Sequence, residues 1–218
     1  GGGIFLYDSE ASFHNVEVSN NTSGCSSCNS DISKGGGIFT ADSNLTMEYV
    51  QINGNKIDAL HGQGGGIHIR KDLSTAAHTV TISNSVFEDN EIHIQDGEEE
   101  WNAGGGIFAF DIAELSLTNV LISENVIDGD DLWEGDQIRG AGFYAGKIND
   151  TTLDNVIISH NDLKGDGCRY ATGAGVYLLK EINLTMTNTS IVDNAITCNN
   201  SHTEAETGDV GGSGIFIR

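Results

Sequence analysis

The chain has 218 residues with 32 acidic and 10 basic side chains, a formal net charge of −22, 29 glycines and no proline. This charge repels nucleic acid and polyanionic polysaccharide, so neither is expected as a partner. No apolar run approaches the roughly 20 residues that cross a bilayer as a helix, so no membrane span is expected in this segment.

Glycine-rich triplets divide the chain. The first is Gly-Gly-Gly followed by Ile-Phe, and the triplets begin at Gly1, Gly35, Gly64, Gly104, Gly140, Gly173 and Gly212. Each predicts a sharp corner before a short strand, because glycine tolerates positive φ and lets two backbones approach closely. The chain starts without Met or a signal peptide and stops within another copy of the motif. We therefore expect residues 1–218 to be a single β-helix segment of a longer chain, with rungs starting near 1, 35, 64, 104, 140, 173 and 212.

A block of fixed register follows each triplet. Each block ends in an asparagine, which gives a column of Asn21, Asn55, Asn90, Asn125, Asn161 and Asn194. Before it, apolar and polar residues alternate with period two, which indicates strands. Blocks of fixed register joined by connections of variable length are typical of a solenoid. Equivalent asparagines would then stack a strand spacing apart, so we predict a hydrogen-bonded structural ladder.

These observations predict an all-β fold without significant helix. No stretch combines helical spacing of apolar residues with a capping residue. Connections between parallel strands are overwhelmingly right-handed, so the expected fold is a right-handed parallel β-helix of about six complete rungs.

A column of mostly aromatic residues follows the first apolar residue after each triplet. Its parity is opposite to that of the apolar residue, so it is expected to face outward. We expect either that the long loops 93–103, 128–139 and 197–211 cover it, or that it is a lateral-contact or sugar-stacking surface. The column consists of Phe5, Phe39, His68, Phe108, Tyr144, Tyr177 and Phe216.

One acidic loop raises the question of a metal. Asp128, Asp130, Asp131 and Asp136 offer the hard oxygen ligands that calcium requires, but their spacing fits neither an EF-hand nor a nonapeptide calcium repeat. They are weak candidates for structural calcium, and a solvated acidic surface is the alternative. No other cofactor is expected.

Four cysteines indicate an oxidising compartment. Cys168 and Cys198 stand in the connections of consecutive rungs and are expected to form one disulfide. Cys25 and Cys28 are expected to form the second.

The chain also contains several N-x-S/T sequons. Those at outward or loop positions are expected to carry N-linked glycans if the source is eukaryotic, namely Asn20, Asn44, Asn149, Asn183 and Asn199. The sequons at Asn21 and Asn188 belong to the asparagine columns and are expected to be used internally.

The motif Gly-Gly-Gly-Ile, followed by Phe87-Glu88-Asp89-Asn90 and its variants in other rungs, resembles the paired GGA-I and F-x-x-N repeats of polymorphic outer-membrane and related surface β-helix proteins. Similar rungs occur in adhesins, autotransporter passengers and pectate-lyase-like enzymes. The resemblance implies display at a cell surface or in the extracellular space, and it supplies no activity by itself.

Catalytic residues are not expected. The Asn-Thr-Asp, Gly-His-Gly and Arg-Ile-Lys motifs of polygalacturonase-like enzymes are missing, and His68, Arg70 and Lys71 are interpreted as decoration of a loop edge. The preferred hypothesis is a non-catalytic extracellular structural or adhesive β-helix, a rigid glycosylated shaft of a surface or fibre-forming protein. Its expected partners are further copies of itself, other surface or matrix proteins, or glycans.

Two other hypotheses remain. One is a carbohydrate-active lyase or hydrolase whose active site lies outside this segment. The other is an ice-binding face built from the Ser/Thr columns, for which we expect no thermal hysteresis because Glu48 and Asp154 interrupt the second hydroxyl column.

Overall fold

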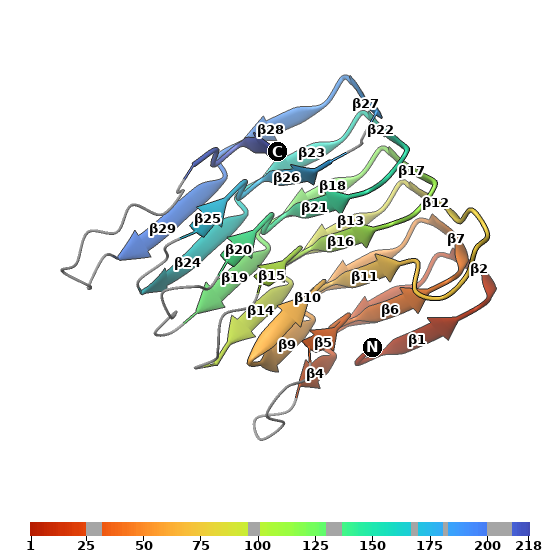
Figure 1. Ribbon diagram of the computed structural model, residues 1–218, viewed down its shortest axis with the longest axis horizontal. Coiled ribbons are helices and arrows are strands. Elements are labelled where there is room, and N and C mark those ends of the chain that lie inside the picture. The colour runs from red at the N-terminus through yellow and green to blue at the C-terminus, as the bar shows by residue number, and fades with distance from the viewer. Residues whose placement is uncertain (25–31, 96–100, 130–136, 167–169, 181–182, 200–210) are drawn as a thin grey trace.

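The computed structural model describes residues 1–24, 32–95, 101–129, 137–166, 170–180, 183–199 and 211–218 (Figure 1). In this part of the chain every regular element is a β-strand, and the strands form five parallel sheets, here named A to E. The chain visits the sheets in that order in each turn. The prediction of an all-β parallel solenoid is confirmed. Five turns have a strand in all five sheets, and the described part of the sixth turn contributes to sheets A to D.

Sheets A and B follow the glycine corner. Sheet A consists of β1 (Ile4–Tyr7), β6 (Ile38–Ala41), β11 (Ile67–Arg70), β16 (Ile107–Phe110), β21 (Phe143–Gly146), β26 (Val176–Leu179) and β30 (Ile215–Ile217). Sheet B consists of β2 (Glu10–His14), β7 (Asn44–Glu48), β12 (Thr79–Ser83), β17 (Glu114–Thr118), β22 (Asp150–Asp154) and β27 (Asn183–Thr187).

Sheets C, D and E complete the turn. Sheet C consists of β3 (Glu17–Ser19), β8 (Gln51–Asn53), β13 (Val86–Glu88), β18 (Leu121–Ser123), β23 (Ile157–Ser159) and β28 (Ser190–Val192). Sheet D consists of β4 (Thr22–Gly24), β9 (Lys56–Ala59), β14 (Glu91–Ile94), β19 (Val126–Gly129), β24 (Asp162–Asp166) and β29 (Ala195–Asn199). Sheet E consists of β5 (Ile32–Lys34), β10 (His61–Gln63), β15 (Trp101–Ala103), β20 (Gln137–Arg139) and β25 (Tyr170–Thr172).

Sheet E corrects part of the loop assignment. The stretches 93–103 and 128–139 were expected to be long loops, but their ends belong to strands of sheets D and E. The connection from sheet D to sheet E changes in length from turn to turn. It is a single residue in the second turn, between Ala59 and His61, and it is longer in the other complete turns.

Residues in left-handed conformation form the corners between sheets. At the corner from sheet E to sheet A the first glycine of each triplet after the first has a φ between 59° and 72°. At the corner from B to C, the equivalent residues have φ between 49° and 54°, a range that asparagine adopts more readily than most side chains. These residues are Asn15, Tyr49, Asn84, Asn119, Asn155 and Asn188.

The interior has two apolar compartments. Side chains of sheets A, B and C fill the larger one, and side chains of sheets D and E, together with Ala141 and Ala174 of the glycine corner, fill the smaller one. The glycine corner lies close to the start of sheet D, since a Cβ placed on Gly65 would be 2.9 Å from the carbonyl oxygen of Glu91. The backbone therefore narrows the cross-section between the two compartments.

The asparagine column runs along this constriction. Each Nδ2 donates to the Oδ1 of the equivalent asparagine in the following turn at 2.8–3.0 Å, from Asn21 to Asn194. The backbone N–H of each of the first five donates to the same oxygen at 3.0–3.1 Å. The four inner asparagines are completely buried: Asn55, Asn90, Asn125 and Asn161. Their amides therefore satisfy backbone and side-chain groups that water cannot reach.

The aromatic column lies on the other side of sheet A from the larger compartment. Its seven rings stack with centroid separations of 4.5–5.4 Å. His68, Phe108, Tyr144 and Tyr177 are at most 2% exposed, so the column is a third packed cluster over most of its length. Ala103 packs against it and the guanidinium of Arg139 lies 5.1 Å from the ring centroid of Tyr177, so residues of sheet E contribute to its cover.

Candidate functional site

The corner from sheet A to sheet B differs between turns. The third turn has a longer connection there, residues 71–78, between β11 and β12. Neighbouring turns make the same corner with shorter connections, such as Asp42-Ser43 in the second turn. The extra residues therefore stand out from the regular wall of the solenoid.

Asp42 fixes the start of this insertion. Its two carboxylate oxygens accept hydrogen bonds from the backbone N–H groups of Asp72 at 2.8 Å and Leu73 at 2.9 Å. Burial alone would raise the pKa of Asp42, but the amides of Leu73, Asp72 and Ser74, with a smaller contribution from His78, hold its pKa below the ordinary value. The carboxylate is therefore ionised at neutral pH.

His78 fixes the end of the insertion. Its carbonyl accepts a hydrogen bond from the N–H of Ala113 in the next turn at 2.9 Å, and its Nε2 lies 3.9 Å from Asp42 Oδ1. The insertion is thus attached to the turn before it and to the turn after it. Its backbone has little freedom to move away from the wall.

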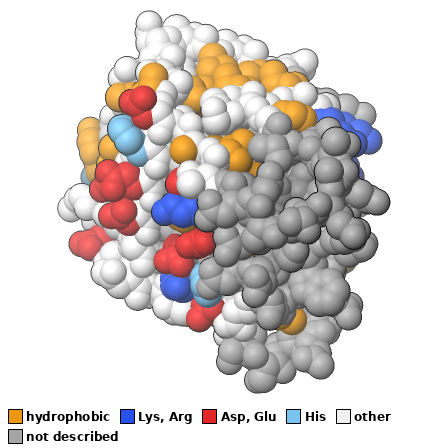
Figure 2. Space-filling model, turned by 90° about the vertical axis from the view of Figure 1, so that its left-hand side faces the viewer, with side chains coloured by type: hydrophobic (Ala, Val, Ile, Leu, Met, Phe, Trp, Pro, Cys, Tyr) orange, Lys and Arg blue, Asp and Glu red, His pale blue; other side chains and the backbone are white. Residues whose placement is uncertain are grey.

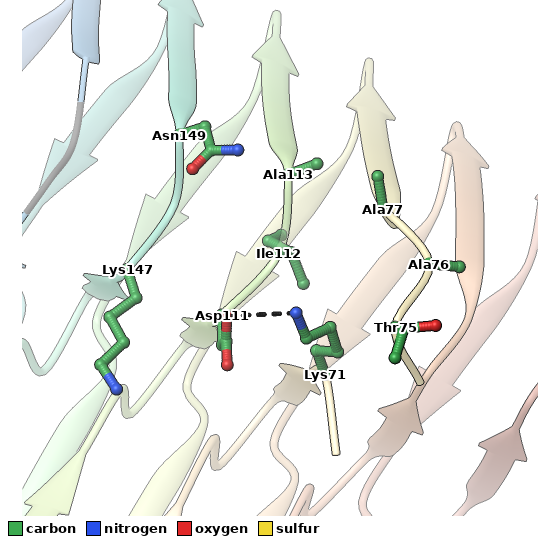
Figure 3. A pocket seen from close by; sticks show the side chains of 9 residues that line it. All are labelled: Lys71, Thr75, Ala76, Ala77, Asp111, Ile112, Ala113, Lys147 and Asn149. Atoms are coloured by element: carbon green, nitrogen blue, oxygen red, sulfur yellow. Dashed lines mark ion pairs between the residues drawn. The ribbon is translucent and has the colours of Figure 1, made fainter. Parts of the chain in front are cut away.

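A shallow pocket of about 200 Å³ lies beside the insertion (Figure 3). The insertion forms one side of it, and the corners of the next two turns form the rest. It is lined by Lys71, Thr75, Ala76, Ala77, Asp111, Ile112, Ala113, Lys147 and Asn149. The buried Ile112 and the three alanines give it an apolar surface, while the other side chains place polar groups around this surface.

Two lysines give this pocket its positive charge. Lys71 Nζ lies 3.7 Å from Asp111 Oδ1, a long ion pair between half-exposed side chains. Lys147 lies over the ring of Phe110, with Nζ 5.2 Å from the centroid. Among the described residues, no carboxylate lies within ion-pair distance of Lys147. The pocket therefore holds one lysine in a loose ion pair and one that is not neutralised.

The side chains of His68 and Arg70 on β11 and of Lys71 directly after it separate in the structure. His68 is fully buried between the rings of Phe39 and Phe108, and Arg70 pairs with Asp72. Lys71 alone reaches the pocket. His68 therefore does not form a catalytic group with these two cations.

The burial of His68 has an electrostatic consequence. Desolvation is the largest cause that lowers its pKa well below the ordinary value, and the charges of Lys34 and Arg70 act in the same direction. The backbone of Gln63 opposes them. His68 is therefore neutral at pH 7, as a ring within an aromatic stack should be.

The outer face of sheet D carries the charged side chains nearest to the calcium candidates. Asp128 lies there in register with His93 and Lys164, and Lys56 pairs with Glu91 at 2.9 Å. Figure 2 shows acidic groups with a few basic groups and histidines on that side of the molecule. Asp130, Asp131 and Asp136 lie outside the described residues, and the described residues contain no group of three His, Cys, Asp or Glu side chains that could hold a metal ion. Calcium binding stays a prediction.

The expected disulfides cannot be placed. Cys25, Cys28 and Cys168 lie outside the described residues, and only the backbone of Cys198, in β29, is described. Both pairings stay predictions.

The sequons occupy different environments. Asn20 and Asn183 are exposed, and Asn44 is partly exposed at the start of β7. Asn44 and Asn183 belong to the same outward column of sheet B as Asp150. Asn149 lines the pocket and the hydroxyl-bearing residue of its sequon, Thr151, is buried, while the side chain of Asn199 lies outside the described residues.

The fold defines the chain as a parallel β-solenoid. No protein family matches the chain, and no curated protein or solved structure matches it either. The resemblance drawn from the glycine and asparagine motifs is therefore supported at the level of architecture and not at the level of a particular surface-protein family. No helix long and apolar enough to cross a membrane occurs in the described ranges.

Proposed function

We propose that this chain is a non-catalytic extracellular β-helix that serves as a rigid, glycosylated shaft in a cell-surface or fibre-forming protein. The observation that carries the proposal is the unbroken asparagine ladder, which joins six successive turns through hydrogen bonds that are buried in the middle and partly buried at the two ends. A fold whose interior repeats in every turn favours length and stiffness over a single specialised site.

Stiffness follows from how the ladder and the aromatic stack are built. Bending the solenoid would separate neighbouring turns on one side, and this would stretch buried hydrogen bonds that have no water to replace them. The stacked rings lie on the opposite side of sheet A from the larger core, so two columns of contacts resist bending at different distances from the axis.

Extracellular location and glycosylation rest on the outward sequons and on the cysteine pairs of the sequence. Asn20, Asn44 and Asn183 stand at exposed or partly exposed positions where a glycan would meet solvent. Glycans there would leave the asparagine ladder untouched, because the ladder asparagines point into the constriction.

Electron microscopy of the full-length protein purified from its native source, combined with intact-mass analysis before and after glycan removal, tests the proposal. We expect an elongated particle and a mass that falls by several glycan units. A polysaccharide-depolymerisation assay on the same material addresses the enzyme alternative. Turnover of any neutral or acidic polysaccharide that is lost with a substitution in this segment would refute the non-catalytic role.

A further inference from the structure

We propose that the pocket at the corner between sheets A and B binds a sugar unit that carries one carboxylate, at the end of an otherwise neutral glycan. This adds a ligand site to the shaft proposed above, and the shaft does not depend on it. The site comprises Lys71, Thr75, Asp111, Ile112, Lys147 and Asn149.

The pocket is held in shape before any ligand arrives. The insertion that forms one side is attached to the second turn through Asp42 and to the fourth turn through the carbonyl of His78. The opposite side consists of corner residues that continue directly from the strands of sheet A. A ligand would therefore lose little affinity to ordering of the protein.

The charge of the pocket favours an anion. The whole chain carries 10 basic residues against 32 acidic ones, yet two lysines and one aspartate line this pocket. The local sum is +2 − 1 = +1, opposite in sign to the net charge of −22. Lys147 has no carboxylate partner among the described residues, so a ligand carboxylate would gain its attraction without having to displace a protein acid.

The remaining lining favours a sugar. A pyranose ring has one face of C–H groups and a rim of hydroxyls, so it needs an apolar surface bordered by hydrogen-bonding groups. Ile112 and the three alanines provide the apolar surface, and Thr75 and Asn149 provide the hydroxyl and amide at its border. Figure 3 shows Ile112 next to the Lys71–Asp111 pair, Thr75 and two of the alanines on one side of it, and Lys147 on the other side with its side chain directed away from the alanines.

The net charge limits how acidic the ligand can be. A chain of −22 repels a polyanion over distances comparable with the Debye length, roughly 8 Å at physiological ionic strength, whereas a single carboxylate at the end of a neutral glycan meets mainly the local positive charge. Asp111 further disfavours ligands with two negative groups, because the second group would be repelled by the Asp111 carboxylate.

The test uses the full-length protein produced in the bacterial periplasm, where Asn149 carries no N-linked glycan. Binding of methyl β-glucuronide is measured by ligand-observed NMR against methyl β-glucoside, which differs only in having CH₂OH in place of the carboxylate. We expect a dissociation constant on the order of 1 mM for the glucuronide and at least fivefold weaker binding of the glucoside. Equal binding of the two sugars would overturn the proposal.

Three variants locate the site. Lys147→Gln should weaken glucuronide binding at least fivefold, and Asp111→Asn should strengthen it, because this substitution removes the competing carboxylate beside Lys71. Lys56→Gln is the matched control, because Lys56 is a half-exposed lysine paired with Glu91 on sheet D. An unchanged affinity in Lys147→Gln, or an equal loss in Lys56→Gln, would refute the site.

A further probe separates a sugar from a peptide. N-acetyl-aspartate amide carries one carboxylate without a pyranose ring, and we expect it to bind at least fivefold more weakly than the glucuronide. Equal affinity would overturn the sugar assignment in favour of an acidic peptide. Thermal unfolding of each variant is followed in parallel, so failure of ligand binding is distinguishable from failure of the shaft.

Discussion

The two kinds of corner in this solenoid differ in how much their residues vary. Where the glycine corner meets the start of sheet D, every turn has an asparagine in the ladder, and the third glycine recurs in every triplet. At the corner between sheets A and B the equivalent residues change sign, from Asp42 to Lys71 to Asp111 to Lys147. The first corner packs against the protein itself, whereas at the second corner Lys71, Asp111 and Lys147 are at least partly exposed. Residue identity is thus constant at the corner where two parts of the same turn pack together. The charge of the side chain varies at the corner between sheets A and B, where no such packing is required.

The largest effect should come from breaking the inner ladder in its middle. Asn90→Ala removes the Nδ2 group that donates to Asn125 Oδ1 and to the carbonyl of Ile52. It also removes the Oδ1 that accepts from the buried backbone N–H of Asn55 and from Asn55 Nδ2, and of these two donors only Nδ2 keeps another acceptor. We expect a loss of about 3 kcal/mol in the free energy of unfolding, because each buried group left unpaired costs about 1–3 kcal/mol. Chemical denaturation measures it.

Asn84→Gly is the matched control for that substitution. Asn84 belongs to the exposed column at the corner between sheets B and C, and glycine keeps the positive φ that this position requires. The loss should stay below about 1 kcal/mol. Equal losses in the two variants would contradict the distinction between the inner and outer columns.

A smaller loss of stability is expected from substitutions of Gly105 and Gly106, two glycines of the same triplet. A Cβ on Gly106 would lie 2.9 Å from the Nδ2 of Asn125, which the ladder holds in place, so Gly106→Ala should cost about 2 kcal/mol by overpacking. A Cβ on Gly105 would start 2.5 Å from the carbonyl oxygen of Ala141, but Ala141 and Ala174 occupy the equivalent position in later turns, so the backbone there can adjust to a methyl group. Gly105→Ala should therefore cost less than Gly106→Ala. The melting temperatures of the two variants give the comparison, and a reversed order would refute the explanation of the triplet.

The stability of the protein should depend on pH through His68, the buried imidazole of the aromatic column. The folded-state pKa of His68 lies below its unfolded value of about 6.5, so the unfolded chain gains a proton first as the pH falls. This lowers stability by about 1.4 kcal/mol per pH unit below 6.5 until the folded pKa is reached, and the effect is absent above 6.5. His68→Phe continues the stack and should remove this contribution. Unfolding curves from pH 7 to pH 5 for both proteins test it, and parallel pH profiles would show that the ring is not buried.

The smallest expected effect is at the attachment of the insertion. Asp42→Asn keeps one acceptor oxygen, so one of the two hydrogen bonds is lost and the other loses its ionic component. It should destabilise the protein by about 1 kcal/mol and speed amide exchange at Asp72 and Leu73. Because the pKa of Asp42 is lowered by folding, its contribution is present at neutral pH and is lost as the pH falls below about 4. Unchanged exchange at both amides would contradict the anchoring role.

Much of the solenoid was predictable because parallel in-register stacking repeats each side-chain environment. Aligning the turns revealed the asparagine column and the alternation of apolar and polar residues around Phe87 and Ile122, since equivalent residues lie directly above one another. The opposite orientation of the aromatic column followed from the same parity. The sequence left open whether the column is covered, because the residues that pack against it, such as Ala103, belong to the short strands of sheet E, which carry no pattern of their own.

The strands of sheet E could not be predicted from the sequence, for a physical reason. Its strands have three residues each, and the residues facing the smaller compartment include Gly62, Asn102 and Ala171, so no apolar period marks them. The pocket could not be predicted from the sequence either. It exists because Asp42 binds amides 30 and 31 residues further along the chain, and a contact of this kind leaves no local pattern in the sequence.

The in-register ladder also bears on how such a chain can evolve. Each turn meets only the turn before and the turn after it through the same asparagine, glycine and aromatic contacts. Duplication of the segment encoding one turn would therefore insert a unit that matches both neighbours and would lengthen the rod by roughly 4.8 Å, the spacing of adjacent strands. Selection could adjust the reach of the molecule in steps of this size while the third, fourth and fifth turns keep their pocket intact.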